Sequence, residues 1–250
     1  MAGMHVVAAP IAASWAVAEN LGRILGAIAA CEPGDLAVFP EGAPSGYDEE
    51  LSGLGSLDPH VLRQGLDAVA AAAAARGVRV ALGTLWPGAT GWQNAAVLLD
   101  PQGGRQWYRK VNLAQHERTV LAPGGVTVGI QLCRELRYPE QWRWLAVQGA
   151  EVLLYLTHAV DHPENRDVWR SLLVSRAAEN QRYVVAVNAA HPRQTCPSAV
   201  IDPGGRVLAE VAGEAEARLR VPLDLTAVSD WYLGQARADL VRLTGQRPGQ

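Results

Sequence analysis

Short apolar segments alternate with segments of helical period along the chain, and this alternation constrains the fold more than any other feature. Residues 126–132 show it well, because valine, isoleucine and leucine recur at every second position, as on one face of a β-strand. Proline and glutamate at 139–140 then favour the start of a helix, and a second apolar strand covers 152–156. Strands that alternate with helices are typical of α/β proteins. We therefore expect an α/β fold, and we see no linker that would divide residues 1–250 into more than one domain.

Composition excludes several classes of protein. The chain has 250 residues, 49% of them hydrophobic, and a formal net charge of −3, so it can bury a large core and lacks the basic excess of a nucleic-acid-binding protein. Its longest apolar runs, such as 68–75, are well short of the roughly 20 residues that a membrane helix needs. The first nine residues contain no basic region and no cleavage signal. We expect a cytoplasmic protein that binds neither nucleic acid nor membrane.

The cysteines point to a reducing compartment. Cys31, Cys133 and Cys196 are far apart and odd in number, which does not suit a disulfide framework. The six histidines are scattered, and no histidine or cysteine cluster has the spacing of metal ligands. We expect no metal and no disulfide.

Two predicted hairpins contain similar turns. The sequence DPQGG occupies 100–104, between predicted strands 94–99 and 106–110, and DPGGR occupies 202–206, between 199–201 and 206–210. This repetition indicates an internal two-fold relationship between the halves of the chain.

Three chemically reactive side chains directly follow predicted strands. Glu41 follows the strand at 36–39, Lys110 closes the first hairpin, and Cys133 ends the strand at 126–132. Such strand exits gather at one edge of an α/β sheet, so residues distant in sequence can meet there. Lys110 is also the only lysine among 22 basic residues, which singles out its position because an ammonium differs chemically from a guanidinium.

A thiol, a carboxylate and an ammonium together support nucleophilic catalysis. The thiolate attacks, the carboxylate accepts its proton, and the ammonium lowers the pKa of the thiol and stabilises an oxyanion. The backbone N–H of Arg134 is a candidate second oxyanion donor. Each residue also has an ordinary interpretation from the sequence: a helix-capping acid for Glu41, a solvated charge for Lys110 and a small buried side chain for Cys133.

The segments around these three residues match a known pattern. Glu41 lies in VFPEGAPSGY, Lys110 in YRKVNL and Cys133 in IQLCRELRYPE. These segments closely resemble the signature blocks of the nitrilase superfamily, the carbon–nitrogen hydrolases. The resemblance continues in family order over nearly the full length, including QNAAVLLDPQGG, GAEVLLYLTHA and SRAAENQRYVVAVN.

The resemblance implies a fold, an assembly and a set of site residues. It implies a four-layer α-β-β-α sandwich that forms a homodimer or a higher homo-oligomer and requires no cofactor. It implies catalytic roles for Glu41, Lys110 and Cys133. It also implies that Glu117 is a second glutamate that orients the site, although Glu117 and Arg118 could equally form a surface ion pair.

Arg134 departs from the family pattern. After the cysteine the family usually has an aromatic residue and then an aspartate, whereas this chain has Arg134 and Glu135. A fixed cation at the pocket rim would favour a carboxylate-bearing substrate. The alternative is that the Arg134 side chain turns to solvent or pairs with Glu135.

Other substrate contacts are predicted by position. We expect Tyr47 to form a wall of the pocket entrance, and Thr157 and His158 to contact substrate because they follow the strand after the cysteine helix. Trp142 and Trp169 are expected to pack on helix faces.

The expected function is a cysteine-dependent hydrolase of non-peptide C–N bonds. The favoured substrate is a small ω-amide of a dicarboxylic acid, cleaved through a thioester with release of ammonia. An N-carbamoyl amine is the first alternative, and a nitrile is the second. A different class of function also remains open at this stage, namely a non-catalytic binding or regulatory module on the same fold.

Overall fold

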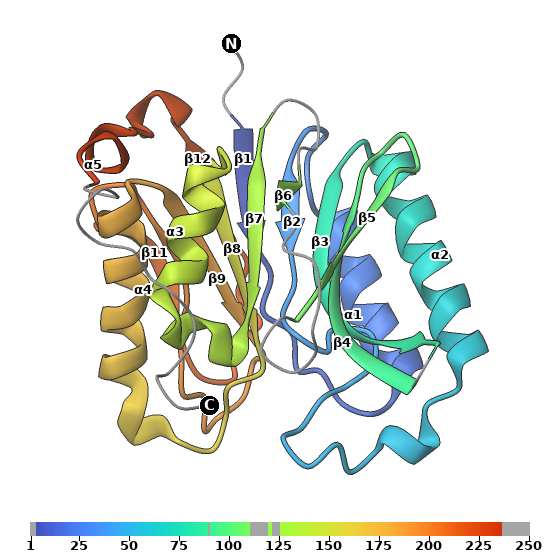
Figure 1. The fold of residues 1–250 in the computed structure, drawn as a ribbon. Helices are drawn as coiled ribbons and strands as arrows, with labels where there is room; N and C mark the ends of the chain where they lie inside the picture. The colour runs from blue at the N-terminus through green and yellow to red at the C-terminus, as the bar shows by residue number, and fades with distance from the viewer. Residues whose placement is uncertain (1–3, 90, 111–119, 122–125, 237–250) are drawn as a thin grey trace.

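Two β-sheets packed face to face form the centre of the molecule, and helices cover both outer faces (Figure 1). The computed structural model describes residues 4–89, 91–110, 120–121 and 126–236. Within these residues each sheet has six strands. Helices α1 (Val17–Ala29) and α2 (Pro59–Arg76) cover one sheet, and α3 (Pro139–Val147) and α4 (Arg166–Asn180) cover the other. The expected four-layer α-β-β-α sandwich is therefore confirmed.

The first sheet is built mainly from the N-terminal half. Its strands in spatial order are β12 (Leu219–Leu223), β1 (Met4–Ala8), β2 (Leu36–Val38), β3 (Arg79–Gly88), β4 (Gly91–Leu99) and β5 (Arg105–Arg109). Strands β1, β2 and β3 are parallel to one another, whereas β12, β4 and β5 pair antiparallel with their neighbours.

The second sheet follows the same plan. Its strands in spatial order are β11 (Val207–Val211), β10 (Ser198–Ile201), β9 (Tyr183–Asn188), β8 (Val152–Thr157), β7 (Val128–Leu132) and β6 (Val120–Leu121). Strands β7, β8 and β9 are parallel, and β10 and β11 form an antiparallel hairpin beside them.

The two halves share one topology. The order β1-α1-β2-α2-β3-β4-β5 in the first half corresponds to β7-α3-β8-α4-β9-β10-β11 in the second. The similar turns DPQGG and DPGGR connect the corresponding hairpins β4–β5 and β10–β11. The predicted internal two-fold relationship is thus confirmed at the level of topology.

Local sequence explains the helix boundaries. The Asp58 side chain accepts a hydrogen bond from the backbone N–H of His60 at the start of α2, and Gly77 adopts φ 70° at its end. Helix α4 ends at Asn180, because Gln181 adopts φ 51° and Tyr183 already pairs with Val152 in the sheet. The remaining helical turns are short: η1 (Leu54–Ser56), η2 (Cys133–Arg137), η3 (Pro163–Asn165), η4 (Leu225–Ala227) and α5 (Trp231–Gly234).

The period-2 pattern of β7 places its side chains in two different layers. Val128, Ile130 and Leu132 are buried between the two sheets. Gly129 faces the other way, where a Cβ atom would lie 2.9 Å from the Leu145 side chain of α3. Helix α3 therefore packs closely on the strand that leads to Cys133.

In the part of the chain that the structure describes, no helix is long and apolar enough to cross a membrane.

Strand β3 supports the turn that carries Glu41. The N–H of Gly83 donates to the carbonyl of Pro40 at 3.1 Å, and the carbonyl of Gly83 accepts from the N–H of Ala43 at 2.8 Å. A Cβ atom on Gly83 would lie 2.6 Å from the Cα atom of Glu41. Glycine is thus required for the close approach of these two backbones.

We expect Gly83→Ala to lower the free energy of unfolding by about 2 kcal/mol, because the new methyl group displaces the backbone of Glu41. Gly26→Ala is the control, since no atom lies within 4 Å of its added Cβ atom in α1. The control should raise the free energy of unfolding by about 0.5–1 kcal/mol, because alanine is favoured within helices. Urea denaturation measures the free energy of unfolding of both variants. A Gly83→Ala protein as stable as the unmodified protein would contradict the tight contact.

Candidate active site

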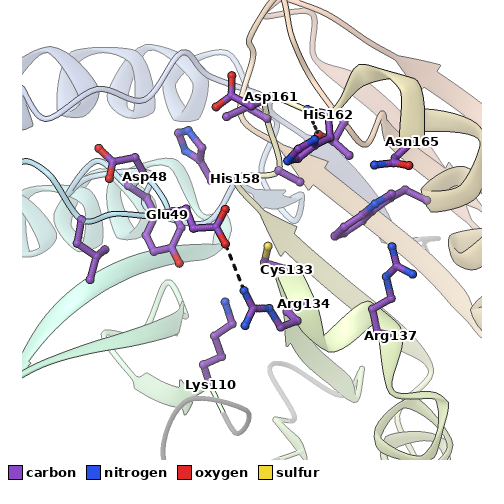
Figure 2. A pocket seen from close by; sticks show the side chains of 16 residues that line it. Asp48, Glu49, Lys110, Cys133, Arg134, Arg137, His158, Asp161, His162 and Asn165 are labelled. Carbon is purple, nitrogen blue, oxygen red and sulfur yellow. Dashed lines mark hydrogen bonds and ion pairs between the residues drawn. The ribbon is translucent and has the colours of Figure 1, made fainter.

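The structure brings Glu41, Lys110 and Cys133 together at the strand exits. Glu41 follows β2, Lys110 follows β5 of the same sheet, and Cys133 follows β7 of the other sheet. Lys110 Nζ donates to Glu41 Oε1 at 2.8 Å, and both side chains are buried, with 4% and 0% of their surfaces exposed. Lys110 and Cys133 line a cavity of about 620 Å³, which is shown in Figure 2.

Several donors hold the Glu41 carboxylate in place. Besides the ammonium of Lys110, Asn94 Nδ2 donates to Oε1 at 2.7 Å, and the backbone N–H of His158 donates to Oε2 at 3.1 Å. These bonds stabilise a carboxylate that burial would otherwise disfavour. Sequence reasoning did not identify Asn94 as a site residue. Its only sequence signal was that an amide precedes the apolar residues of β4, at the position that pairs with Lys110 in the hairpin.

Cys133 occupies a strained position at the start of η2. Its φ angle is 43°, a left-handed conformation that a residue with a β-carbon rarely adopts. The hydroxyl of Tyr155, on the neighbouring strand β8, donates to the Cys133 carbonyl at 2.8 Å. The sharp turn points the sulfur into the cavity (Figure 2).

The thiol of Cys133 is protonated in the resting protein. Burial and the charge of Glu41 raise its pKa to about 12, whereas Lys110 and the hydroxyl of Thr157 lower it by less. We expected Lys110 to lower the pKa of the thiol, and its contribution has that sign, but burial and the carboxylate outweigh it. The thiol therefore needs a base before it can attack, and Glu41 is beside it.

Lys110 remains an ammonium in this environment. Burial opposes its charge, but the negative charge of Glu41 and the hydrogen bond to it raise the pKa of Lys110 above its ordinary value. Its Nζ also lies 5.9 Å from the ring centroid of Tyr47. The site thus holds a fixed positive charge next to the sulfur, where an oxyanion would form during acyl transfer.

Arg134 lies at the rim of the cavity. Its guanidinium pairs with Glu49 at 3.4 Å, and both side chains are largely exposed (Figure 2). The predicted alternative is therefore right in its first half, because the Arg134 side chain turns to solvent. Its second half, a pair with Glu135, is wrong because the Glu135 carboxylate points into the core and accepts hydrogen bonds from Tyr108 and the Leu132 N–H.

The remaining predicted residues occupy different positions. Tyr47 and His158 line the cavity, with ring centroids 5.9 Å apart. Thr157 is completely buried and lies behind the wall, so a direct contact with substrate stays a prediction. Glu117 lies outside the described residues. Among the residues that are described, no group of three or more His, Cys, Asp or Glu side chains is arranged to hold a metal ion.

Trp169 is a cavity residue that the sequence did not reveal. We expected it to pack on a helix face, and it does pack against the same core as the buried Trp142. Trp169 also lines the cavity, where the Arg137 guanidinium lies 5.5 Å from its ring centroid. Helical period places Trp169 on the inner side of α4 and cannot tell a packed face from a cavity wall.

Comparison with known proteins identifies a family of hydrolases that this chain resembles over most of its length. The model of the carbon-nitrogen hydrolase family matches residues 5–232. An (R)-stereoselective amidase from Pseudomonas sp. is 35% identical in an alignment of 223 residues that covers 83% of this chain and 80% of the relative. A 2-oxoglutaramate amidase from Bacillus subtilis is 32% identical in an alignment of 209 residues that covers 76% of this chain and 78% of the relative.

Solved structures share the fold at lower identity. An amidase from Nesterenkonia sp. superposes with a TM-score of 0.79 at 24% identity, covering 95% of each chain. A CN-hydrolase superfamily protein from Xanthomonas campestris superposes with a TM-score of 0.80 at 21% identity, covering 98% of this chain and all of that one.

The raised pKa of Cys133 predicts how the thiol titrates. We expect no thiolate absorbance from Cys133 up to about pH 10, above the range in which an unperturbed thiol ionises. Glu41→Gln should move the titration to lower pH, because the mutation removes a negative charge that disfavours the thiolate. Ultraviolet difference spectra against Cys133→Ala measure the thiolate of Cys133 as a function of pH in each protein. A thiolate already present at neutral pH in the unmodified protein would contradict the raised pKa of Cys133.

Proposed function

The chain belongs to the carbon–nitrogen hydrolase family, and we propose that it is an amidase in which Cys133 is the nucleophile. The observation that carries this proposal is the buried Lys110–Glu41 ion pair beside the protonated thiol, at the inner end of an accessible cavity. This arrangement provides a base and an oxyanion-stabilising cation at the same sulfur. A binding module would have no need of this combination.

In the first half of the reaction, the thiol proton moves to Glu41 as the sulfur attacks the amide carbon. A C–S bond forms, and the electron pair of the carbonyl double bond moves to oxygen. Lys110 Nζ and the backbone N–H of Arg134 stabilise the resulting oxyanion. The raised pKa of the thiol suits this step, because a thiol of high pKa gives a strong nucleophile once its proton is removed.

In the second half, the tetrahedral intermediate collapses and the C–N bond breaks. Glu41 returns the proton to the leaving nitrogen, so ammonia or an amine departs and a thioester remains on Cys133. Water then attacks the thioester carbon while Glu41 accepts a proton from it. The C–S bond breaks, the acid is released, and Glu41 returns this proton to the sulfur, which restores the thiol. Lys110 stays charged throughout, so Glu41 alone carries the transferred proton.

The cavity favours a small amide with an anionic end. Its volume of about 620 Å³ exceeds the needs of a simple aliphatic amide, and its wall contains Arg134 and Arg137. Guanidinium groups bind carboxylates with paired hydrogen bonds. An ω-amide of a dicarboxylic acid fits these features, and the similarity to a 2-oxoglutaramate amidase supports the same class. The homo-oligomer implied by the family resemblance and the cytoplasmic location expected from the composition both stay predictions.

Replacement of the nucleophile should abolish the activity. We expect Cys133→Ala to reduce ammonia release from ω-amides to the uncatalysed level while the thermal unfolding transition is retained. Cys31→Ala is the matched control, because Cys31 is buried under α1 and far from the cavity. Persistent ammonia release in Cys133→Ala would show that the thiol mechanism is wrong.

A substrate screen separates the alternatives for the unmodified protein. Ammonia release is measured for ω-amides, N-carbamoyl amines and nitriles under the same conditions. Preference for a carbamoyl amine or a nitrile would replace the proposed substrate class. Release from none of the three would favour a non-catalytic module.

Arg134 should contribute to recognition of the carboxylate. We expect Arg134→Gln to raise KM for a carboxylate-bearing ω-amide by about tenfold, because one charge-assisted hydrogen bond is lost. KM for an uncharged aliphatic amide should not change. Arg170→Gln is the control, since Arg170 pairs with Glu210 outside the cavity. Equal effects of Arg134→Gln on charged and uncharged amides would contradict the role.

A further inference from the structure

Glu135 is a carboxylate in an unusual place. It is completely buried, although its neighbour Arg134 is exposed at the cavity rim. Carboxylates are rarely buried in full, because removing the charge from water costs free energy that hydrogen bonds must offset. Glu135 Oε2 accepts one bond from the N–H of Leu132 and another from the hydroxyl of Tyr108, each at 2.7 Å.

On one side, Glu135 holds the turn that presents the nucleophile. Its carboxylate binds the backbone directly before Cys133, and its own carbonyl accepts a bond from Trp142 Nε1 at 2.9 Å. The hydroxyl of Tyr155 holds the carbonyl of Cys133 itself. A strained residue such as Cys133, with φ 43°, persists only where the surrounding structure determines its conformation. The hydrogen bonds on both sides of Cys133 provide that constraint.

On the other side, the same carboxylate reaches the strand that carries the lysine. Tyr108 lies on β5 of the opposite sheet, two residues before Lys110, and its side chain is buried between the sheets. Residues two apart on a strand face the same side, so Tyr108 and Lys110 both point toward the second sheet. The backbone hydrogen bonds between β4 and β5 continue to Lys110, whose N–H donates to the carbonyl of Asn94 at 3.0 Å.

We propose that Tyr108 and Glu135 are positioning residues, whose hydrogen bond across the two sheets fixes the Cys133 turn relative to Lys110 and Glu41. This inference rests on the roles of Cys133 and Lys110 proposed above. The nucleophile and the oxyanion-stabilising cation come from different sheets, so their separation depends on how the sheets dock. Apolar packing alone is not directional. The Tyr108–Glu135 bond adds a directional constraint within a few residues of both groups.

The test is Tyr108→Phe, which removes one hydroxyl and keeps the packed ring. We expect kcat for an ω-amide to fall by about 10- to 100-fold, because small displacements of catalytic groups have effects of this size. KM should change little, because Tyr108 does not line the cavity. The matched control is Tyr183→Phe. Tyr183 is also buried between the sheets, and its hydroxyl bonds the backbone of Asp224 after β12. It lies at the start of β9, opposite Val152, whereas the cavity lies beyond the other end of the neighbouring strand β8. Tyr183→Phe should lose about as much thermal stability as Tyr108→Phe but should keep the kcat of the unmodified protein.

A double-mutant cycle tests whether Tyr108 acts through Glu135. Glu135→Gln alone should also lower kcat, and Tyr108→Phe should add no further loss in the Glu135→Gln background, because the two residues act as one unit. If Glu135→Gln does not fold, the comparison of Tyr108→Phe with Tyr183→Phe still decides the question.

Two outcomes would overturn the inference: equal kcat for Tyr108→Phe and Tyr183→Phe, or fully additive losses in the cycle. These failures are distinct from failure of the proposed function. An inactive Cys133→Ala protein combined with a fully active Tyr108→Phe protein would leave the thiol mechanism intact and remove only the positioning role.

Discussion

The buried ion pair between Lys110 and Glu41 is the interaction on which the rest of the site depends. Two opposite charges removed from water are stable only if their geometry is good and further hydrogen bonds satisfy the remaining polar atoms. Asn94 and the N–H of His158 supply such bonds. The pair therefore constrains four separate segments of the chain, and it sets the electrostatic environment in which the thiol of Cys133 is held protonated.

The sandwich explains how an ion pair and a nucleophile come to share one cavity. Parallel strands present their carboxyl ends at one edge of a sheet. Glu41 and Lys110 lie at the ends of strands in the first sheet, and Cys133 lies at the end of a strand in the second. Face-to-face packing of the two sheets joins these edges. The apolar layer between the sheets, which holds Val128, Ile130 and Leu132, thus determines the geometry of the site as well as the stability of the fold.

The sequence carried enough information to predict most of the architecture and the three residues that meet at the strand exits. Glu41 and Cys133 each follow a strand whose apolar pattern stops abruptly, and Lys110 is the only lysine and closes a predicted hairpin. All three can therefore be identified from neighbouring residues and composition. The partners could not be predicted in the same way. Asn94 lies 53 positions from Glu41, and Tyr108 lies 27 positions from Glu135, so these contacts exist only once the sheets have formed. The ion pair of Arg134 with Glu49 depends equally on the approach of distant loops.

The position of β12 has a consequence for the order in which the protein forms. This strand follows β11 of the second sheet, yet it pairs with β1 of the first, with Met4 opposite Leu223. One edge of β1 therefore lacks its neighbouring strand until residues 219–223 have been synthesised, and contacts between residues so far apart in sequence form slowly. The charged pair belongs to the half of the chain that leaves the ribosome first, and the thiol belongs to the later half. The ion pair and the thiol can therefore face each other only after both halves have been synthesised and their sheets have packed together.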